Sequence, residues 1–330
     1  MKLIIQIPCL NEEKTLPIAL DDLPKSIEGI DEIEYLIIND GSDDKTITAA
    51  RNWGVDYIVS FHRNKGLASA FMAGLDVALE NGADIIVNTD ADNQYLGEDI
   101  ARLVEPILKH KADIVIGERP IDDNQEFSFL KKKLQHLGSW AVRQASHTDI
   151  PDAPSGFRAF SREAALRINV VNDYTYTLET IVQAGREKIA ITSVPIHTNP
   201  ALRESRLAKS MFRYVRTSML TILRAYLIYK PLKFFVFLSL FPIVPGLFIG
   251  LRFLYFFFTT GGAGHIQSLI FGCTLLILGF LTIMIGILGD AMSANRKILQ
   301  NVQYHTRLDH YERVAAQRSD KREKGIIFDR

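Results

Sequence analysis

Short apolar runs alternate with amphipathic stretches over roughly the first 200 residues of the chain. The apolar runs predict β-strands at residues 3–7, 35–38, 57–59, 85–87 and 114–116. The stretches between them predict helices at residues 15–23, 46–53, 67–79 and 97–108. Apolar strands that alternate with helices are typical of an α/β fold whose mostly parallel sheet is covered on both sides. Ligands of such folds bind beyond the carboxyl ends of the strands, so motifs at these ends are the first candidates for a site.

The second half of the chain has two long apolar stretches. Residues 234–251 carry no charge, the run continues after Arg252 to residue 258, and residues 266–289 are also uncharged. About 20 helical residues, at about 1.5 Å each, cross the hydrocarbon core of a bilayer. We therefore predict a transmembrane hairpin over residues 231–289, with helices at about 233–258 and 266–289. Pro242, Pro245 and Arg252 leave open a kinked or re-entrant first helix.

Charge indicates how this hairpin is oriented. The connector 259–265 holds no Lys or Arg, whereas both outer flanks are basic, with Arg296 and Lys297 on the second. By the positive-inside rule, both ends of the hairpin are predicted to be cytoplasmic. The first residues are too short and too strand-like for a signal peptide, so the N-terminal domain is also expected in the cytoplasm. The sequence predicts a multi-pass protein of the cell membrane.

Overall charge is balanced, at 38 basic and 38 acidic residues, but the segment before the hairpin is strongly basic. Between residues 200 and 233 the only acid is Glu204, against eight Lys and Arg. Such a run favours an anionic surface, either nucleic acid or lipid headgroups, and its place beside the hairpin favours headgroups. Residues 205–230 are predicted to form an amphipathic helix in the membrane interface, with an ordinary surface helix as the alternative. No nucleic-acid partner is predicted, and residues 290–330 are interpreted as a polar cytoplasmic tail.

The most informative polar motif follows the predicted strand 85–87. It reads Asn-Thr-Asp-Ala-Asp-Asn-Gln and holds Asp90 and Asp92. Two carboxylates at a strand exit can converge on one divalent cation, and Mg²⁺ and Mn²⁺ prefer oxygen ligands, often shared with substrate phosphates. A metal on a diphosphate neutralises the charge that builds on the leaving group when a sugar is transferred from a nucleotide. The alternative is a solvated turn that happens to contain two acids.

Two other polar turns follow predicted strands. Asp40 and Gly41 come after strand 35–38, and Asn11 and Glu12 come after strand 3–7. Asp40-Gly41 is compatible with a plain turn that leads into a helix cap. The functional alternative is that Asp40 accepts hydrogen bonds from the base or ribose of a nucleotide.

Taken together, these motifs resemble the family 2 glycosyltransferases with a GT-A fold. The motifs, in chain order, are Pro8-x-x-Asn11-Glu12, Asp40-Gly41-Ser42-x-Asp44-x-Thr46, Asn64-x-Gly66, Asp90-x-Asp92 and Ser155-Gly156-Phe157-Arg158. More narrowly, the chain looks like the dolichol-phosphate mannose synthase and polyprenyl-phosphate glycosyltransferase branch. The resemblance covers about residues 1–230 and implies a cytoplasmic GT-A catalytic domain, with a Rossmann-like sheet, at residues 1–204.

The resemblance also implies roles for individual residues. The nucleotide-sugar site would comprise Pro8, Asn11, Glu12, Asp40, Lys65, Gly66, Asp90, Ala91, Asp92 and Gln94. Mg²⁺ or Mn²⁺ would be held by Asp90, Asp92 and Gln94. The catalytic residues would be Asp90, Asp92, Arg119, Arg203 and Arg206, with Ser155, Arg158 and Arg203 on the acceptor phosphate. Relatives often carry Pro-Pro shortly after the acidic pair, whereas Tyr95-Leu96-Gly97-Glu98 follows here, which leaves the identity of the sugar open.

The implied reaction is inverting transfer of a hexose from a UDP- or GDP-hexose to a polyprenyl phosphate, dolichyl or undecaprenyl, at the cytoplasmic face. A lipid monophosphate needs no strong general base, but it needs cationic groups, which the arginines supply. Asp152 and Glu179 are candidates for holding sugar hydroxyls, with structural roles as the alternative. Other readings are transfer to another lipid or polysaccharide acceptor, or a non-catalytic nucleotide-sugar-binding membrane protein. Self-association as a homo-oligomer is left open.

Overall fold

The computed structural model describes residues 1–120, 142–143, 146, 148–170, 176–200, 227, 231–261, 265–318 and 326–329. The chain divides into two compact units. Unit 1 combines Met1–Met219 with Gln303–Arg330, and unit 2 is Leu220–Val302. Arg203, Arg206 and, apart from residue 227, the predicted interfacial helix at 205–230 lie outside the described residues.

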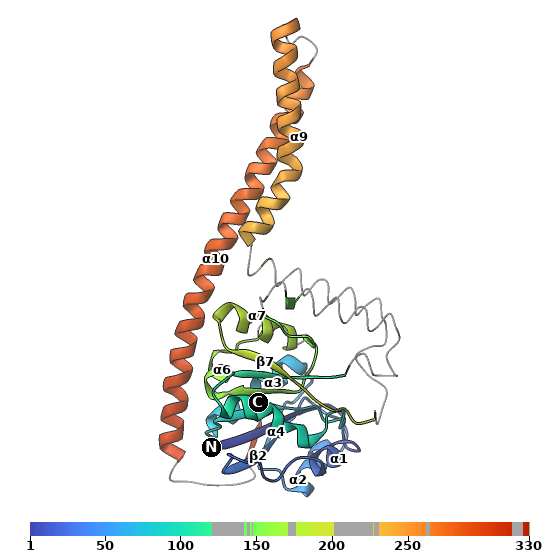
Figure 1. Cartoon of the computed structure of the whole chain (residues 1–330), viewed down its shortest axis with the longest axis vertical. Coiled ribbons are helices and arrows are strands. Elements are labelled where there is room, and N and C mark those ends of the chain that lie inside the picture. Colours follow the sequence, from blue (N-terminus) through green and yellow to red (C-terminus); the bar gives the residue numbers. More distant parts are fainter. Residues whose placement is uncertain are drawn as a thin grey trace. The chain divides into compact units, whose positions relative to one another are not determined.

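Unit 1 is built on one eight-stranded sheet with the strand order β7-β5-β6-β4-β1-β2-β3-β8 (Figure 1). The strands are β1 Lys2–Cys9, β2 Glu32–Asn39, β3 Tyr57–Ser60, β4 Ile85–Asn88, β5 Ile114–Glu118, β6 Arg158–Ser161, β7 Ile191–Pro195 and β8 Ile326–Asp329. All neighbours pair in parallel except β6, which is antiparallel to both β4 and β5. The mostly parallel sheet and its first five strands agree with the sequence prediction, whereas β6, β7 and β8 were not predicted.

Helices cover both faces of this sheet. They are α1 Leu16–Asp21, α2 Thr46–Trp53, α3 Leu67–Glu80, α4 Ile100–Leu108, α6 Arg162–Arg167 and α7 Thr177–Glu187, with a 3₁₀ turn η1 at Gly97–Asp99. Alternate side chains of β1 point to opposite faces, as strand geometry requires. Ile5 lies in the apolar core that α1 and α4 share with the sheet, while Gln6 faces Gly74 of α3. The predicted two-sided cover of the sheet is therefore confirmed.

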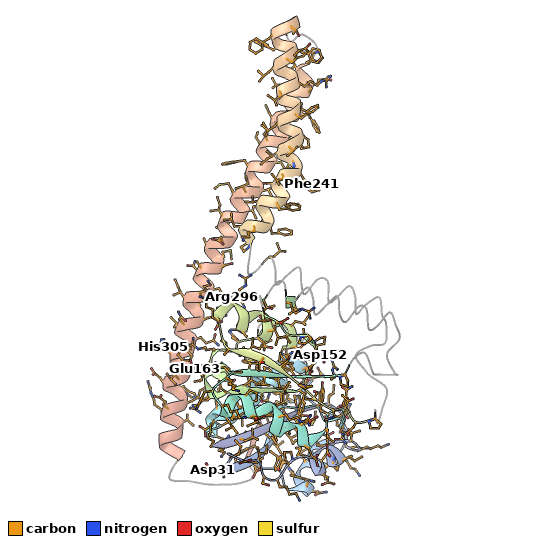
Figure 2. The ribbon with its side chains drawn as sticks, in the orientation of Figure 1. Asp31, Asp152, Glu163, Phe241, Arg296 and His305 are labelled. Carbon is orange, nitrogen blue, oxygen red and sulfur yellow. The ribbon has the colours of Figure 1, made fainter. Side chains whose placement is uncertain are left out.

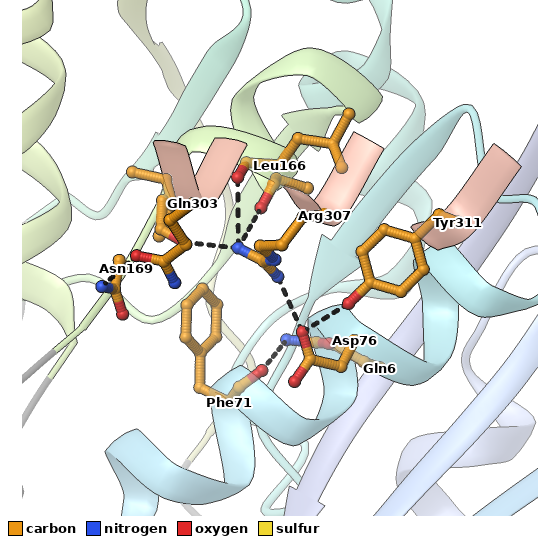
Figure 3. A network of polar contacts seen from close by, with 10 residues as sticks. Gln6, Phe71, Asp76, Leu166, Asn169, Gln303, Arg307 and Tyr311 are labelled. Atoms are coloured by element: carbon orange, nitrogen blue, oxygen red, sulfur yellow. Dashed lines mark hydrogen bonds and ion pairs between the residues drawn. The ribbon is translucent and has the colours of Figure 1, made fainter. Parts of the chain in front are cut away.

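The last turns of the long helix α10, Ile266–Arg318, belong to unit 1 from Gln303 onward. Arg307 donates from Nη1 to the carbonyl oxygens of Leu166 (3.2 Å) and Ile168 (3.0 Å) at the end of α6, and from Nη2 to Asp76 Oδ1 (2.7 Å) on α3. The hydroxyl of Tyr311 donates to the same carboxylate oxygen at 2.8 Å (Figure 3). The interpretation of residues 290–330 as a polar cytoplasmic tail did not include this docking on unit 1.

Removing the Arg307 side chain is expected to destabilise unit 1. Arg307→Ala leaves the carbonyls of α6 and the Asp76 carboxylate short of a donor, which costs about 1–3 kcal/mol per poorly satisfied group. Thermal unfolding followed by tryptophan fluorescence measures the change, since both tryptophans, Trp53 and Trp140, belong to unit 1. Arg313→Ala, at an exposed position of the same helix, is the matched control. Equal melting temperatures for the two variants would contradict the docking.

Unit 2 holds two apolar helices that are long enough to cross a membrane, Pro231–Thr259 of α9 and the first part of α10. Helix α9, Pro231–Thr260, runs through both of its prolines as one helix, so a re-entrant element is not supported. Its large side chains face outward, as for Phe241, which is 74% exposed (Figure 2). Gly272, Gly279 and Gly286 of α10 recur every seven residues and lie against α9. This seam of small residues lets the two helices pack closely, as membrane helices do.

Candidate active site

The loops that follow β1 and β2 are interlocked at the carboxyl edge of the sheet. The backbone N–H of Asn11 donates to Ser42 Oγ (2.9 Å), and its side-chain oxygen accepts from the backbone N–H of Asp43 (2.9 Å). The backbone N–H of Glu12 donates to Thr46 Oγ1 (2.9 Å). Pro8, near the end of β1, is partly exposed. The structure thus brings the first two motifs together as one edge, and their contact with a nucleotide stays a prediction.

Asp40 anchors a third loop to this edge. Its Oδ1 accepts the backbone N–H of Lys65 (2.7 Å) and its Oδ2 that of Gly66 (3.0 Å). Burial raises the pKa of Asp40, while these two amides act in the opposite direction. Gly41 lets the turn after β2 approach the loop that contains Arg63, since a Cβ at position 41 would lie 2.5 Å from the backbone of Arg63. Part of the Asp40 carboxylate is therefore occupied in shaping the loop, and a role toward the nucleotide stays a prediction.

The acidic turn follows β4 directly. Ala91 is buried in the core, and Asn93 takes a left-handed conformation with φ 55°, which asparagine tolerates better than most residues. The backbone N–H of Gln94 donates to Asp92 Oδ1 at 3.3 Å. Asp90 and Asp92 are both partly exposed. The turn therefore holds two carboxylates and one amide side chain at the sheet edge, as the sequence predicted.

The acids at this edge fit a divalent cation. Burial raises the pKa of Cys9, the last residue of β1, and the charges of Glu12, Asp44 and Asp90 raise it further, so negative charge from three loops gathers there. A diphosphate would be repelled unless a cation offset that charge. Within the described residues no cluster of three or more His, Cys, Asp or Glu side chains forms a closed metal site. An open set of two carboxylates and an amide suits Mg²⁺ or Mn²⁺, which share ligands with substrate phosphates.

Arg119, just beyond β5, is held by a buried carboxylate. Its Nε donates to Asp152 Oδ2 (2.7 Å) and its Nη2 to Asp152 Oδ1 (3.0 Å), a bidentate pair. Burial opposes the charged form, but Tyr95, Asp152 and Asp90 together raise the pKa of Arg119. Asp152 is fully buried (labelled in Figure 2), so the expectation that it holds a sugar hydroxyl is corrected: it orients Arg119.

Arg158, the first residue of β6, lies in the protein interior and not at the expected acceptor site. It is fully buried, and its guanidinium donates to four oxygen atoms of the protein at 2.6–2.8 Å. These are the carbonyls of Ala153, Ser155 and Thr177, and Thr180 Oγ1. The expected contact with an acceptor phosphate is therefore contradicted, because Arg158 binds the loop 153–155 to α7 instead. Ser155 is also fully buried, and its phosphate contact stays a prediction.

Arg203 and Arg206 fall outside the described residues, so their role stays a prediction. Glu179 lies on α7 and is partly exposed. Tyr95, which marks the departure from the Pro-Pro of relatives, stacks on Phe157 with ring centroids 4.8 Å apart. Sequence reasoning noticed this departure but found no function for it.

The mostly parallel α/β sheet, with an acidic turn after β4 and an arginine beyond β5, is the GT-A-like architecture of a glycosyltransferase. The model of glycosyl transferase family 2 matches residues 4–168, and the chain belongs to that family. It is 31% identical over 217 residues to the UDP-N-acetylglucosamine–dolichyl-phosphate N-acetylglucosaminyltransferase of Methanococcus voltae, covering 58% of this chain and 83% of the relative. The undecaprenyl-phosphate mannosyltransferase of Micrococcus luteus is 27% identical over 207 residues, covering 59% and 83%.

Among solved structures, the fold is similar to glucosyl-3-phosphoglycerate synthase from Mycobacterium tuberculosis in complex with Mn²⁺, UDP and phosphoglyceric acid. The TM-score is 0.53 at 20% identity, over 67% of this chain and 78% of that one. This likeness confirms the predicted GT-A-like fold. The named relatives confirm the resemblance to the polyprenyl-phosphate glycosyltransferase branch.

Proposed function

We propose that this glycosyltransferase moves a hexose from a nucleotide-diphosphate sugar to a polyprenyl phosphate, with inversion at the anomeric carbon. The observation that carries the proposal is the pairing of acids and an oriented arginine at one sheet edge. Asp90 acts electrostatically on Arg119, which Asp152 holds in place. Carboxylates for a metal and a guanidinium for phosphate are what a reaction between two anionic phosphate compounds requires.

The donor side of the site would use the acidic turn. Asp90, Asp92 and Gln94 would hold Mg²⁺ or Mn²⁺, which supplies charge neutralisation for the nucleoside diphosphate that leaves. Asp40 and the loop it anchors, with Pro8, Asn11 and Glu12, would receive the nucleotide. The fold neighbour that was solved with Mn²⁺ and UDP supports this arrangement.

The acceptor side would depend on arginines rather than on a general base. A phosphate monoester has a second pKa of about 6, so much of it is dianionic at neutral pH and already nucleophilic. Arg119, kept charged by its neighbours, would orient that dianion for in-line attack, with Arg203 and Arg206 as further phosphate ligands. Rate enhancement would come from positioning and fixed charge. The relatives named for transfer to dolichyl and undecaprenyl phosphate support this acceptor.

The two apolar helices support a membrane location close to a lipid acceptor. We propose that they form a hairpin with both ends in the cytoplasm, because basic residues flank them and the connector has no Lys or Arg. The catalytic domain would then face the cytoplasm.

A donor and acceptor panel tests the proposal. Purified full-length protein is incubated with UDP- and GDP-hexoses, Mn²⁺ and polyprenyl phosphate, and the lipids are analysed by mass spectrometry. The expected result is one hexosyl-phospholipid that depends on the protein, on Mn²⁺ and on a single donor. Donor hydrolysis without any glycolipid would point to another acceptor, and the absence of both would contradict the proposal.

A further inference from the structure

Gly156 is held by side chains on both of its backbone groups. Its N–H donates to the hydroxyl of Tyr95 at 3.2 Å. Its carbonyl oxygen accepts from the hydroxyl of Tyr176 (3.1 Å) and from Asn88 Nδ2 (3.0 Å). These partners come from the end of β4, the turn after it and the residue before α7. The two peptide groups that flank the Cα of Gly156 are thus fixed from three parts of the chain.

The partners are themselves fixed in the core. Asn88 Nδ2 also donates to Tyr176 Oη (2.8 Å), and Gln6 Nε2 donates to Asn88 Oδ1 (3.0 Å). Gln6, Asn88 and Tyr176 are all fully buried. The ring of Tyr176 stacks on Phe71 with centroids 3.9 Å apart and planes within 4°. Rotation of this ring would break the stack, so its hydroxyl has little freedom.

The carboxylate of Asp90 lies directly against Gly156. A Cβ added at Gly156 would be 3.2 Å from both carboxylate oxygens of Asp90 and 3.2 Å from the hydroxyl of Tyr176. The carboxylate of Asp90 therefore packs against Gly156, whose position is set by hydrogen bonds to Asn88, Tyr95 and Tyr176.

We propose that Tyr176 is a positioning residue for the acidic turn: its hydroxyl, with Asn88, fixes Gly156, and Gly156 fixes the carboxylate of Asp90. This inference rests on the proposed function, in which Asp90 binds a divalent cation. Partners that orient a metal ligand set its affinity, and their loss typically weakens metal binding about 10- to 100-fold. A glycine at 156 leaves room for that carboxylate, since a Cβ there would crowd both of its oxygens at 3.2 Å.

Tyr176→Phe tests the inference because it keeps the ring stacked on Phe71 and removes only the hydroxyl. The bond between Asn88 and Gly156 remains, so the variant is expected to fold. Tyr311→Phe is the matched control. It too removes the hydroxyl of a buried tyrosine, and in this case the hydroxyl donates to the carboxylate of Asp76. Mn²⁺ binding to the full-length protein is measured by electron paramagnetic resonance, with UDP or GDP present, and thermal unfolding is recorded alongside.

Tyr176→Phe is expected to weaken Mn²⁺ binding by about 10-fold or more, while Tyr311→Phe binds Mn²⁺ like the wild type. Loss of melting temperature in both variants without a difference in Mn²⁺ affinity would overturn the inference, since the hydroxyl of Tyr176 would then be structural only. Should Tyr176→Phe fail to fold, Gly156→Ala decides, because it keeps both tyrosines and places a Cβ 3.2 Å from both oxygens of the Asp90 carboxylate. Wild-type affinity in Gly156→Ala would then overturn the inference.

Failure of the proposed function gives a different result. In that case the wild-type protein binds no Mn²⁺ with either nucleotide, or Asp92→Ala binds it unchanged. Either outcome removes the metal site and the inference with it. Normal Mn²⁺ binding by the wild type and by Tyr176→Phe, with loss in Asp92→Ala, overturns the inference alone.

Discussion

Asp92→Ala is expected to abolish sugar transfer while the protein still folds and inserts into membranes. Asp92 is partly exposed in a turn at the edge of the sheet, and its Oδ1 accepts the backbone N–H of Gln94 at 3.3 Å. Its loss should therefore cost little stability. The same carboxylate would carry half of the acidic charge on the proposed metal, so its removal takes away transition-state stabilisation. Loss of one preorganised electrostatic group lowers kcat by about 100- to 1,000-fold, and loss of a metal ligand is expected to cost at least that much.

Radiolabelled transfer to polyprenyl phosphate measures the effect, and thermal unfolding shows whether the variant is folded. Glu98→Ala is the matched control, because Glu98 is an exposed acid only six positions further along the chain. It should transfer sugar at the wild-type rate. Wild-type turnover by Asp92→Ala would refute the assignment of the metal to this turn.

The parts of the molecule that sequence predicted well depend on local pattern. Each of the first five strands contains an apolar run that a polar turn follows, interrupted in β1 by Gln6, and the pattern does not mark the outer residues of the strands. Because the carboxyl ends of parallel strands meet at one edge, the turns with Asp40 and with Asp90 had to lie near each other. The sequence could therefore predict that both turns lie at the carboxyl edge of the sheet, whereas the strand order that brings them together came only from the structure.

The parts that sequence missed depend on contacts between distant residues. Strand β6 begins with Arg158, whose charge hides a strand that is fully buried between β4 and β5. The neighbouring sequence does not distinguish an arginine that binds phosphate from one whose N–H groups donate to backbone carbonyl oxygens. In the same way, the polar surface of α10 beyond Asp290 gave no sign that Arg307 would bind Asp76, 231 positions earlier.

Because Arg158 is buried among carbonyl oxygens, a second prediction is that Arg158→Leu unfolds unit 1 rather than weakening acceptor binding. The substitution removes the four short hydrogen bonds that the guanidinium donates to three carbonyl oxygens and one hydroxyl in the core. A hydrogen bond to a charged group contributes about 1.5–3 kcal/mol, so the loss of all four approaches the 5–15 kcal/mol by which a typical domain is stable. Burial lowers the pKa of Arg158 to about 10, so the guanidinium of the wild-type protein is charged at neutral pH and keeps all its N–H donors.

Arg162→Leu is the control, because Arg162 follows the same strand but is partly exposed, and its guanidinium donates to the carbonyl oxygen of Ala83 at 3.3 Å. We expect Arg158→Leu to be largely unfolded or to melt far below the wild type, with Arg162→Leu close to it. The sequence-based role predicts the opposite: a folded Arg158→Leu protein with an unchanged melting temperature and a raised KM for polyprenyl phosphate. That result would return Arg158 to the acceptor site and require the guanidinium to leave its carbonyl partners when lipid binds.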